Sequence, residues 1–177
     1  MQKQGLYFLF ISNVFNTQGG LVIKVYLFDW GDTLMVDFPH ETGKMCEWDI
    51  VEAVAEAKST LSILSQHAHI YIATGAADST ETEIKHAFAR AELSQFISGY
   101  FCKANVGISK GTPEFLLAIL DKLQVPAANV AVVGDNFEKD IKPAIATDIQ
   151  AFWFTNNDST TIAKKVTIIH HLSALYQ

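Results

Sequence analysis

The sequence is short of basic residues, of cysteine and of long apolar runs. Thirteen lysines and arginines stand against nineteen acidic residues, and the net charge of -6 argues against nucleic acid or an anionic membrane surface as a partner. A small anionic ligand stays compatible with this charge, because its site needs only one or two local cations. The two cysteines, Cys46 and Cys102, lie far apart and in no metal-ligand spacing, so we expect reduced thiols and a cytoplasmic location.

The apolar run near the N-terminus, LYFLFISNVF over residues 6–15, is shorter than the roughly 20 residues that a membrane span needs. One lysine precedes it, and the NTQGG that follows lacks the small-residue cleavage site of an export signal. We therefore expect residues 1–20 to be an N-terminal extension, to which the sequence assigns no role. Residues 21–177 are long enough for one domain with a proper hydrophobic core.

Strand-like and helix-like segments alternate from residue 21 onward. Runs rich in β-branched and aromatic residues predict strands over residues 22–28, 69–73, 100–103, 130–133, 149–154 and 166–169. Apolar residues recur at helical spacing over residues 50–64, 84–91 and 115–123. Asp78 with Glu81 has the spacing of a capping box, and Thr112 before Pro113 predicts another helix start. The alternation predicts an α/β fold, a three-layer, Rossmann-like parallel sheet with helices on both faces.

Polar residues stand where the predicted strands end. Asp29 follows the first strand, Thr74 the second and Asp135 the fourth, and Lys110 lies just before a predicted helix. In an open parallel sheet, ligands bind at the carboxyl ends of the strands. Carboxylates such as Asp29 and Asp135 suit Mg²⁺, whereas a hydroxyl and an ammonium group can hold the oxygens of a phosphoryl group. With the phosphoryl group held in line, Asp29 could attack it as a nucleophile and form an aspartyl-phosphate.

The motifs FDWGDTL, IATG, SKGTPEF and VVGDNFEKD, in this order, resemble those of the haloacid dehalogenase-like superfamily, whose members are mostly Mg²⁺-dependent phosphatases. The likeness extends from Ile23 to the C-terminus, and the first motif looks most like a bacterial group of hydrolases with LFDWGDTLM at this place. Response-regulator receiver domains use similar residues, but their paired acids come first and their lysine last. A dinucleotide-binding fold would need GxGxxG after the first strand, which is absent.

The resemblance implies a role for each motif residue. It implies three catalytic residues, namely Asp29 as the nucleophile with Thr74 and Lys110 as phosphate ligands. It also implies a Mg²⁺ site formed by Asp29, Gly31, Asp135 and Asp140. Gly31 would contribute its backbone carbonyl, and Asp140 would orient the lysine or a metal-bound water.

One position departs from the family pattern. Phosphatases of this superfamily usually carry a second aspartate two residues after the nucleophile, as acid to the leaving group and base to water, and here that position is Gly31. Loss of such a group typically costs about 10² to 10⁴-fold in rate. Asp32 could replace it only if the turn swings its carboxylate toward the leaving oxygen. An alternative function follows, a phospholigand-binding or regulatory protein with weak turnover. Dehalogenation is less favoured, because that reaction would not use the complete set of Mg²⁺ ligands.

The spacing of the motifs leaves no room for a cap domain. Residues 35–69 and 75–109 are each nearly used up by one loop and one helix. We therefore predict a capless phosphohydrolase with an open site. Its partner would be a phosphorylated small molecule or macromolecule, or a second subunit that closes the site in a homo-oligomer. The loop over residues 36–48 is the expected lid, and its His40, Lys44 and Trp48 could contact the leaving group.

Overall fold

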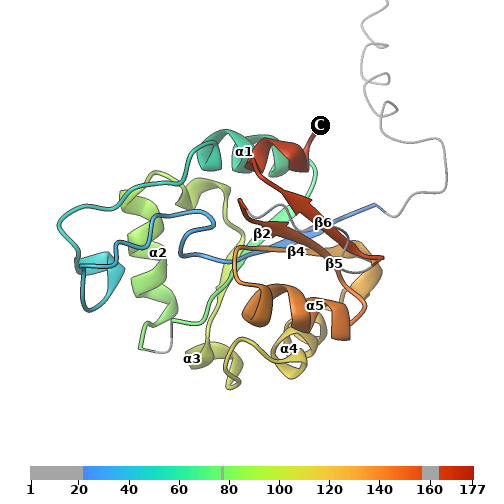
Figure 1. Cartoon of the computed structure of the whole chain (residues 1–177). Coiled ribbons are helices and arrows are strands. Elements are labelled where there is room, and N and C mark those ends of the chain that lie inside the picture. The colour runs from blue at the N-terminus through green and yellow to red at the C-terminus, as the bar shows by residue number, and fades with distance from the viewer. Residues whose placement is uncertain (1–21, 77, 157–163) are drawn as a thin grey trace, which may run out of the picture.

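A six-stranded parallel sheet forms the centre of the protein. The computed structural model describes residues 22–76, 78–156 and 164–177, so the predicted extension over residues 1–20 lies outside the described part. In that part, six strands lie in the order β3-β2-β1-β4-β5-β6 (Figure 1). Their bounds are Val25–Phe28 for β1, His69–Ala73 for β2, Gly99–Phe101 for β3, Val130–Gly134 for β4, Gln150–Phe154 for β5 and Val166–Ile169 for β6. The predicted strands and the predicted parallel sheet are confirmed, with shifts of a few residues at their ends.

The two central strands are buried along their whole length, which explains their continuous apolar sequences. All four residues of β1 and all five of β4 are buried. Strands of this kind occur where helices cover both faces of a parallel sheet. In the register of the two strands, Phe28 lies opposite Val133. Asp29 and Gly134, the next residues along each strand, therefore reach the same edge of the sheet.

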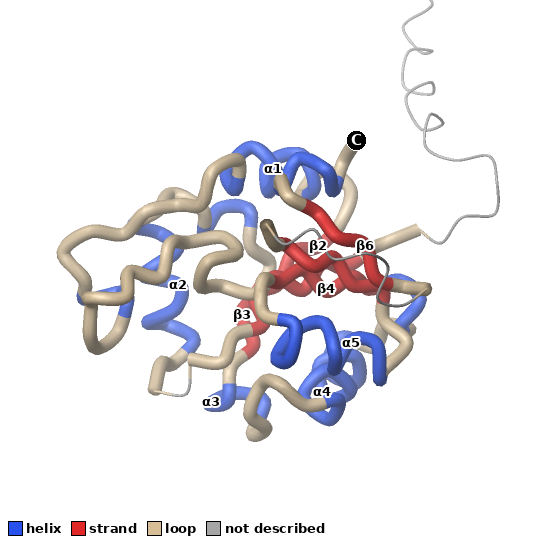
Figure 2. The backbone as a smooth tube through the Cα atoms, viewed as in Figure 1, coloured by secondary structure: helices blue, strands red, loops and turns tan. Residues whose placement is uncertain are grey.

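Helices cover both faces of the sheet, as the sequence predicts. The α-helices are α1 Ala57–Leu64, α2 Glu81–Arg90, α3 Lys103–Val106, α4 Pro113–Leu123 and α5 Lys142–Ala146. Short 3-10 turns cover Met45–Glu47, Ser94–Phe96, Ala127–Asn129 and Leu172–Leu175, and a π-helical turn covers Phe137–Ile141. One core cluster joins Phe28 to residues of α1 and α2, and the other joins Leu27 to residues of α4 and α5. Figure 2 shows α4 and α5 on the opposite side of the sheet from α1.

Of the two helix starts predicted from capping residues, one differs from the structure and one is confirmed. The capping box predicted at Asp78 and Glu81 is wrong, because the box forms two residues later. The Thr80 N–H donates to Glu83 Oε2 (2.8 Å), and Thr80 Oγ1 accepts from the Glu83 N–H (3.4 Å). Both pairs have the same spacing, so the sequence pattern could not choose between them. At the third helix, Thr112 Oγ1 accepts from the Phe115 N–H (3.4 Å), which confirms the start at Thr112 and Pro113.

The helix predicted over residues 50–64 begins only at Ala57. The residue before it, Glu56, has a left-handed backbone with φ 67°. Further upstream, Ala53 forms an antiparallel bridge with Met35, so residues 52–54 pair with the loop that follows β1 instead of forming helix. Only the second half of the predicted range 50–64 is therefore helical.

The described residues contain no cap domain, as predicted from the motif spacing. The segment between β1 and β2 consists of a loop, a short 3-10 turn and α1, and the segment between β2 and Lys110 consists of α2, a 3-10 turn, β3 and α3. None of the described helices is both long and apolar enough to cross a bilayer. The carboxyl ends of the strands are therefore covered only by loops.

Candidate active site

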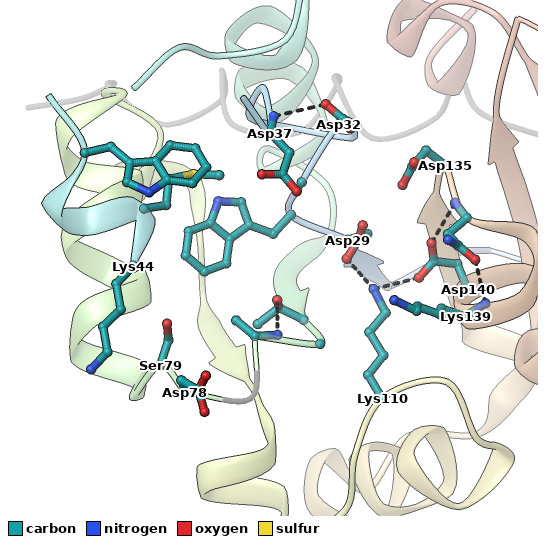
Figure 3. A pocket seen from close by; sticks show the side chains of 18 of the residues that line it. Asp29, Asp32, Asp37, Lys44, Asp78, Ser79, Lys110, Asp135, Lys139 and Asp140 are labelled. Carbon is teal, nitrogen blue, oxygen red and sulfur yellow. Dashed lines mark hydrogen bonds and ion pairs between the residues drawn. The ribbon is translucent and has the colours of Figure 1, made fainter. Parts of the chain in front are cut away.

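A pocket of about 830 Å³ opens at the carboxyl edge of the sheet. Its volume lies in the range of about 300–1,000 Å³ that small-molecule sites occupy. All six residues predicted from the motifs line it, namely Asp29, Gly31, Thr74, Lys110, Asp135 and Asp140. Figure 3 shows the charged members of this set facing one another. The sheet thus brings together residues that lie far apart in the sequence.

Lys110 lies between two carboxylates. Its ammonium group forms an ion pair with Asp29 and another with Asp140, with Nζ 2.6 Å from Asp140 Oδ1. The lysine side chain is only 7% exposed and that of Asp140 only 1%. Burial alone would lower the pKa of Lys110, but the two carboxylates outweigh burial and raise its pKa. Lys110 is therefore a permanent cation at the floor of the pocket (Figure 3).

Asp140 is held in place by the backbone around it. Its Oδ2 accepts a hydrogen bond from the Asn136 N–H (3.0 Å), within the π-helical turn that follows β4. Burial raises the pKa of Asp140 to about 6, Lys110 acts to lower it and Asp29 adds to the rise. Gly134 leaves the space that this carboxylate occupies, since a Cβ there would lie 2.3 Å from Asp140 Oδ2.

Asp135 is fixed by two residues that the sequence reasoning missed. The Thr33 hydroxyl accepts from the Asp135 N–H (3.1 Å) and lies 3.3 Å from Asp135 Oδ1, to which it donates. The Trp153 indole N–H donates to the Asp135 carbonyl (2.8 Å). Thr33 is fully buried within the first motif, and this burial is visible only in the structure. Burial and then the charge of Asp29 raise the pKa of Asp135.

Three carboxylates meet at one point of the pocket. Asp29, Asp135 and Asp140 each offer an oxygen atom, and these atoms all lie within 4.8 Å of one another. Carboxylate oxygens are the ligands that Mg²⁺ prefers in proteins. Lys110 forms ion pairs with Asp29 and Asp140 but carries a single positive charge, whereas Asp135 forms no ion pair with any residue in the described part of the chain. The donor set therefore fits a divalent cation.

Thr74 directly follows β2 and lines the pocket. The Thr74 N–H donates to the Phe101 carbonyl (2.9 Å), which ties this turn to the end of β3. Its Oγ1 accepts from the Ala76 N–H (3.1 Å), so the hydroxyl hydrogen is left to donate. A hydroxyl donor held in this way suits an anionic oxygen in the pocket.

The turn after Asp29 brings a further acid, Asp37, to the pocket. Asp32 has a left-handed backbone with φ 53°, and its Oδ1 accepts from the Asp37 N–H (3.0 Å). Asp37 and Asp32 both line the pocket, and Asp32 is bonded to the Asp37 backbone (Figure 3). Partial burial, Asp32 and Asp29 together raise the pKa of Asp37. Sequence reasoning missed this residue, because it stands in a loop and follows no strand.

The expected lid loop forms one wall of the pocket. Lys44 and Trp48 line the pocket, whereas the exposed His40 lies outside the lining. Lys44 pairs with Glu83 of α2 (2.6 Å), and Arg90 of the same helix donates to the Trp48 carbonyl (2.6 Å). Lys44 and then Thr80 lower the pKa of Glu83 to about 2. The loop is thus attached to α2 at both ends of that helix.

The comparison with protein families identifies one match. A family model described as a hydrolase, haloacid dehalogenase-like hydrolase, matches residues 31–148 of the 177 residues. The matched range includes the second, third and fourth motifs and the turn after Asp29. No curated protein is similar enough to the chain to count as a match.

Three solved structures illustrate the similarity of the fold. An uncharacterized protein from Listeria monocytogenes serotype 4b has a TM-score of 0.73 at 19% identity, with 86% of this chain and 94% of that chain covered. YfnB of Bacillus subtilis, described as a HAD-hydrolase and solved bound to magnesium, has a TM-score of 0.69 at 14% identity, with 88% and 97% covered. A 2-haloacid dehalogenase from Pseudomonas syringae pv. Tomato has a TM-score of 0.66 at 19% identity, with 87% and 96% covered. At such identities the likeness concerns the fold alone.

Proposed function

Because this chain belongs to the haloacid dehalogenase-like hydrolases, we propose that it is a Mg²⁺-dependent phosphatase that hydrolyses a phosphate ester through Asp29. One observation carries the proposal: a buried lysine and three carboxylates meet in a single pocket. A phosphoryl group needs both a cation for its oxygens and a nucleophile in line with its leaving group. Lys110 and Asp29 supply these two functions at neighbouring positions.

The reaction would proceed in two displacements. An Asp29 oxygen attacks phosphorus, the bond from phosphorus to the ester oxygen breaks, and the alcohol leaves. Water then attacks the phosphorus of the aspartyl-phosphate, which releases inorganic phosphate and restores the Asp29 carboxylate. Thr74 and Lys110 hold the phosphoryl oxygens during both steps.

The acidic side chains of the pocket would hold the metal ion. Asp29, Asp135 and the Gly31 carbonyl would be its ligands, and Asp140 would stand behind Lys110 or bind through water. A bound Mg²⁺ would neutralise charge on the phosphoryl oxygens. The Bacillus subtilis relative was solved with magnesium bound, which supports this assignment.

The substrate would be a phosphorylated small molecule or a phosphorylated segment of a macromolecule in the cytoplasm. A pocket of about 830 Å³ that only loops cover can admit either kind. Both cysteines are free thiols, in keeping with the proposed location.

Two other functions compete with this one. The relative from Pseudomonas syringae is a 2-haloacid dehalogenase, and such a reaction would also use a carboxylate nucleophile. A dehalogenase reaction would assign no role to Asp135 and Asp140, which lie close to Asp29. The lack of a side chain at Gly31 favours the second rival, a protein that binds a phospholigand with weak turnover.

A comparison of wild type with Asp29→Asn tests the proposal. With Mg²⁺, wild type should release phosphate from acetyl phosphate, p-nitrophenyl phosphate and glycerol 2-phosphate. Asp29→Asn should lower this release at least about a hundredfold, the lower end of what a positioned catalytic group contributes. Asp121→Asn, an exposed acid on α4, is the isosteric control and should keep the wild-type rate.

Three results would contradict the phosphatase proposal. The first is wild-type phosphate release no greater than that of Asp29→Asn. The second is halide release from a 2-haloacid without Mg²⁺, which identifies a dehalogenase. The third is calorimetric binding of inorganic phosphate with Mg²⁺ but without turnover, which identifies a phospholigand-binding protein.

A further inference from the structure

Hydrolysis through Asp29 requires a proton donor that the strand-end motifs do not supply. An alkyl ester leaves as an alkoxide unless a proton reaches its oxygen, and the attacking water must lose a proton. Gly31 has no side chain to perform either task. Lys110, Asp135 and Asp140 are engaged with one another, with the backbone or with the metal site.

Asp37 fills the space that a side chain at position 31 would enter. A Cβ built on Gly31 would lie 3.3 Å from Asp37 Oδ2 and 3.6 Å from Asp37 Cγ. The Asp37 carboxylate therefore lies at the start of the path that such a side chain would take. In Figure 3 this carboxylate points into the pocket on the side of Asp29.

The turn after Asp29 holds Asp37 in this position. The Asp32 N–H donates to the Met35 carbonyl (2.7 Å), which closes the turn. Asp32 Oδ1 then accepts from the Asp37 N–H (3.0 Å). The following residues are held as well, because the Val36 N–H donates to the Glu52 carbonyl (2.9 Å). Asp32 thus supports the Asp37 backbone through its Oδ1.

Asp78 is a less suitable donor. It lies beside Ser79 on the Lys44 side of the pocket, away from Asp37 and from the turn after Asp29 (Figure 3). A group that protonates the leaving oxygen must lie within hydrogen-bond reach of that oxygen, opposite the attacking carboxylate. Of these two acids, Asp37 is the one that stands next to Gly31.

We propose that Asp37 is the acid and base of the reaction, in place of a side chain at position 31. The inference rests on the proposed phosphatase activity. In the first displacement the proton of the Asp37 carboxyl passes to the ester oxygen as its bond to phosphorus breaks, and the product leaves as a neutral alcohol. In the second, the Asp37 carboxylate takes a proton from the water that attacks the aspartyl-phosphate.

The same geometry explains why position 31 is glycine. A side chain there would press on the Asp37 carboxylate at 3.3 Å, so that this carboxylate would have to shift by a few tenths of an ångström. Truncation of Asp37 to alanine would remove the two atoms at 3.3 and 3.6 Å and leave its Cβ at 3.4 Å. A carboxylate at position 31 and a carboxylate at position 37 are therefore alternatives. Gly31→Asp combined with Asp37→Ala should move the acid from the loop to the turn.

Leaving-group dependence tests the role of Asp37. Asp37→Asn and Asp37→Ala should lower kcat/KM for glycerol 2-phosphate by about 10² to 10⁴-fold. The value for acetyl phosphate, whose leaving group needs no proton, should change less than about tenfold. Asp49→Asn, an exposed acid outside the pocket lining, should leave both values unchanged. Gly31→Asp/Asp37→Ala should recover at least about tenfold of the loss seen for Asp37→Ala with glycerol 2-phosphate.

The outcomes separate this inference from the proposed function. If Asp29→Asn abolishes turnover but the Asp37 variants keep kcat/KM for glycerol 2-phosphate within threefold of wild type, Asp37 is not the acid and the phosphatase proposal stands. Equal losses for acetyl phosphate and glycerol 2-phosphate would also overturn the role of Asp37. A wild-type chain with no turnover above Asp29→Asn would overturn both. A melting curve for each variant checks that it folds.

Discussion

At the scale of single residues, Gly134 is the most tightly constrained position in the site. A Cβ at this residue would lie 2.3 Å from Oδ2, 2.4 Å from Cγ and 2.7 Å from Cβ of Asp140. The carboxylate would have to move, and it would lose its contacts with Lys110 and with the Asn136 N–H. Gly134 therefore permits the placement of the lysine on which the proposed chemistry depends.

Gly134→Ala should destabilise the protein and impair the site together. Forced overpacking of this kind costs about 1–3 kcal/mol in the free energy of unfolding, which urea denaturation measures. Mg²⁺-dependent phosphate release should fall as well, because Asp140 no longer holds Lys110. Gly75→Ala is the control, since the nearest atom to a Cβ there is 3.9 Å away. A variant at Gly134 as stable as the one at Gly75 would show that Asp140 can shift freely.

The grouping of the six motif residues was predictable, because each follows a strand or precedes a helix whose sequence pattern is clear. Asp37 was not predictable, since its position depends on the left-handed backbone of Asp32 and on the path of a loop. The contact of Trp153 with Asp135 depends on the pairing of β4 with β5, in which Gly134 lies opposite Trp153. The sequence pattern of a strand gives little information on which residues of the neighbouring strand it pairs with.

At the scale of the elements, the start of α2 connects helix stability to the pocket wall. Thr80 and Glu83 form a reciprocal capping box, and Glu83 also pairs with Lys44 of the lid loop. The N-cap satisfies backbone N–H groups that the first helical turn leaves free. A weakened cap should therefore loosen the contact between the helix and the loop.

Thr80→Ala should lower the free energy of unfolding by about 1 kcal/mol, the usual cost of removing a threonine N-cap. Thr82→Ala, an exposed threonine inside the same helix, should change it little or raise it slightly, since alanine has the higher helix propensity. Thermal denaturation of the two variants provides the comparison. Equal stabilities of the two variants would show that Thr80 is not the N-cap and that another residue, for example Asp78, caps the helix.

The elements themselves were largely predictable, but their ends were not. The six strands and the helices over residues 81–90 and 113–123 follow from apolar spacing. The region 50–64 shows why such patterns fail, because the bridge between Met35 and Ala53 pairs part of the stripe with the loop that follows β1. A tertiary contact overrides a local preference there.

At the scale of the whole molecule, the proposed metal site joins segments that the sequence separates widely. Asp29 follows β1, and Asp135 with Asp140 follows β4, so a cation bound between them would connect the two central strands at their ends. Binding of an ion to the folded state alone stabilises that state by mass action. The stability of the fold should therefore depend on Mg²⁺.

Mg²⁺ at about 100 times its dissociation constant should raise the free energy of unfolding by about 2.7 kcal/mol relative to protein in a chelator. Asp135→Asn should abolish most of this gain, because one ligand loses its charge, whereas Asp121→Asn should retain it. Denaturation curves with and without the metal measure the effect and require no substrate. The same gain in Asp135→Asn as in wild type would exclude Asp135 as a ligand.

The three tryptophans of the chain all stand at the site. Trp30 and Trp48 line the pocket, and Trp153 donates to the Asp135 carbonyl. The tryptophan emission of the protein, excited selectively over that of its five tyrosines, therefore comes from this edge of the sheet. The chain carries its own optical probe, and one spectrum recorded during a titration reports the occupancy of the pocket without a label or a coupled assay.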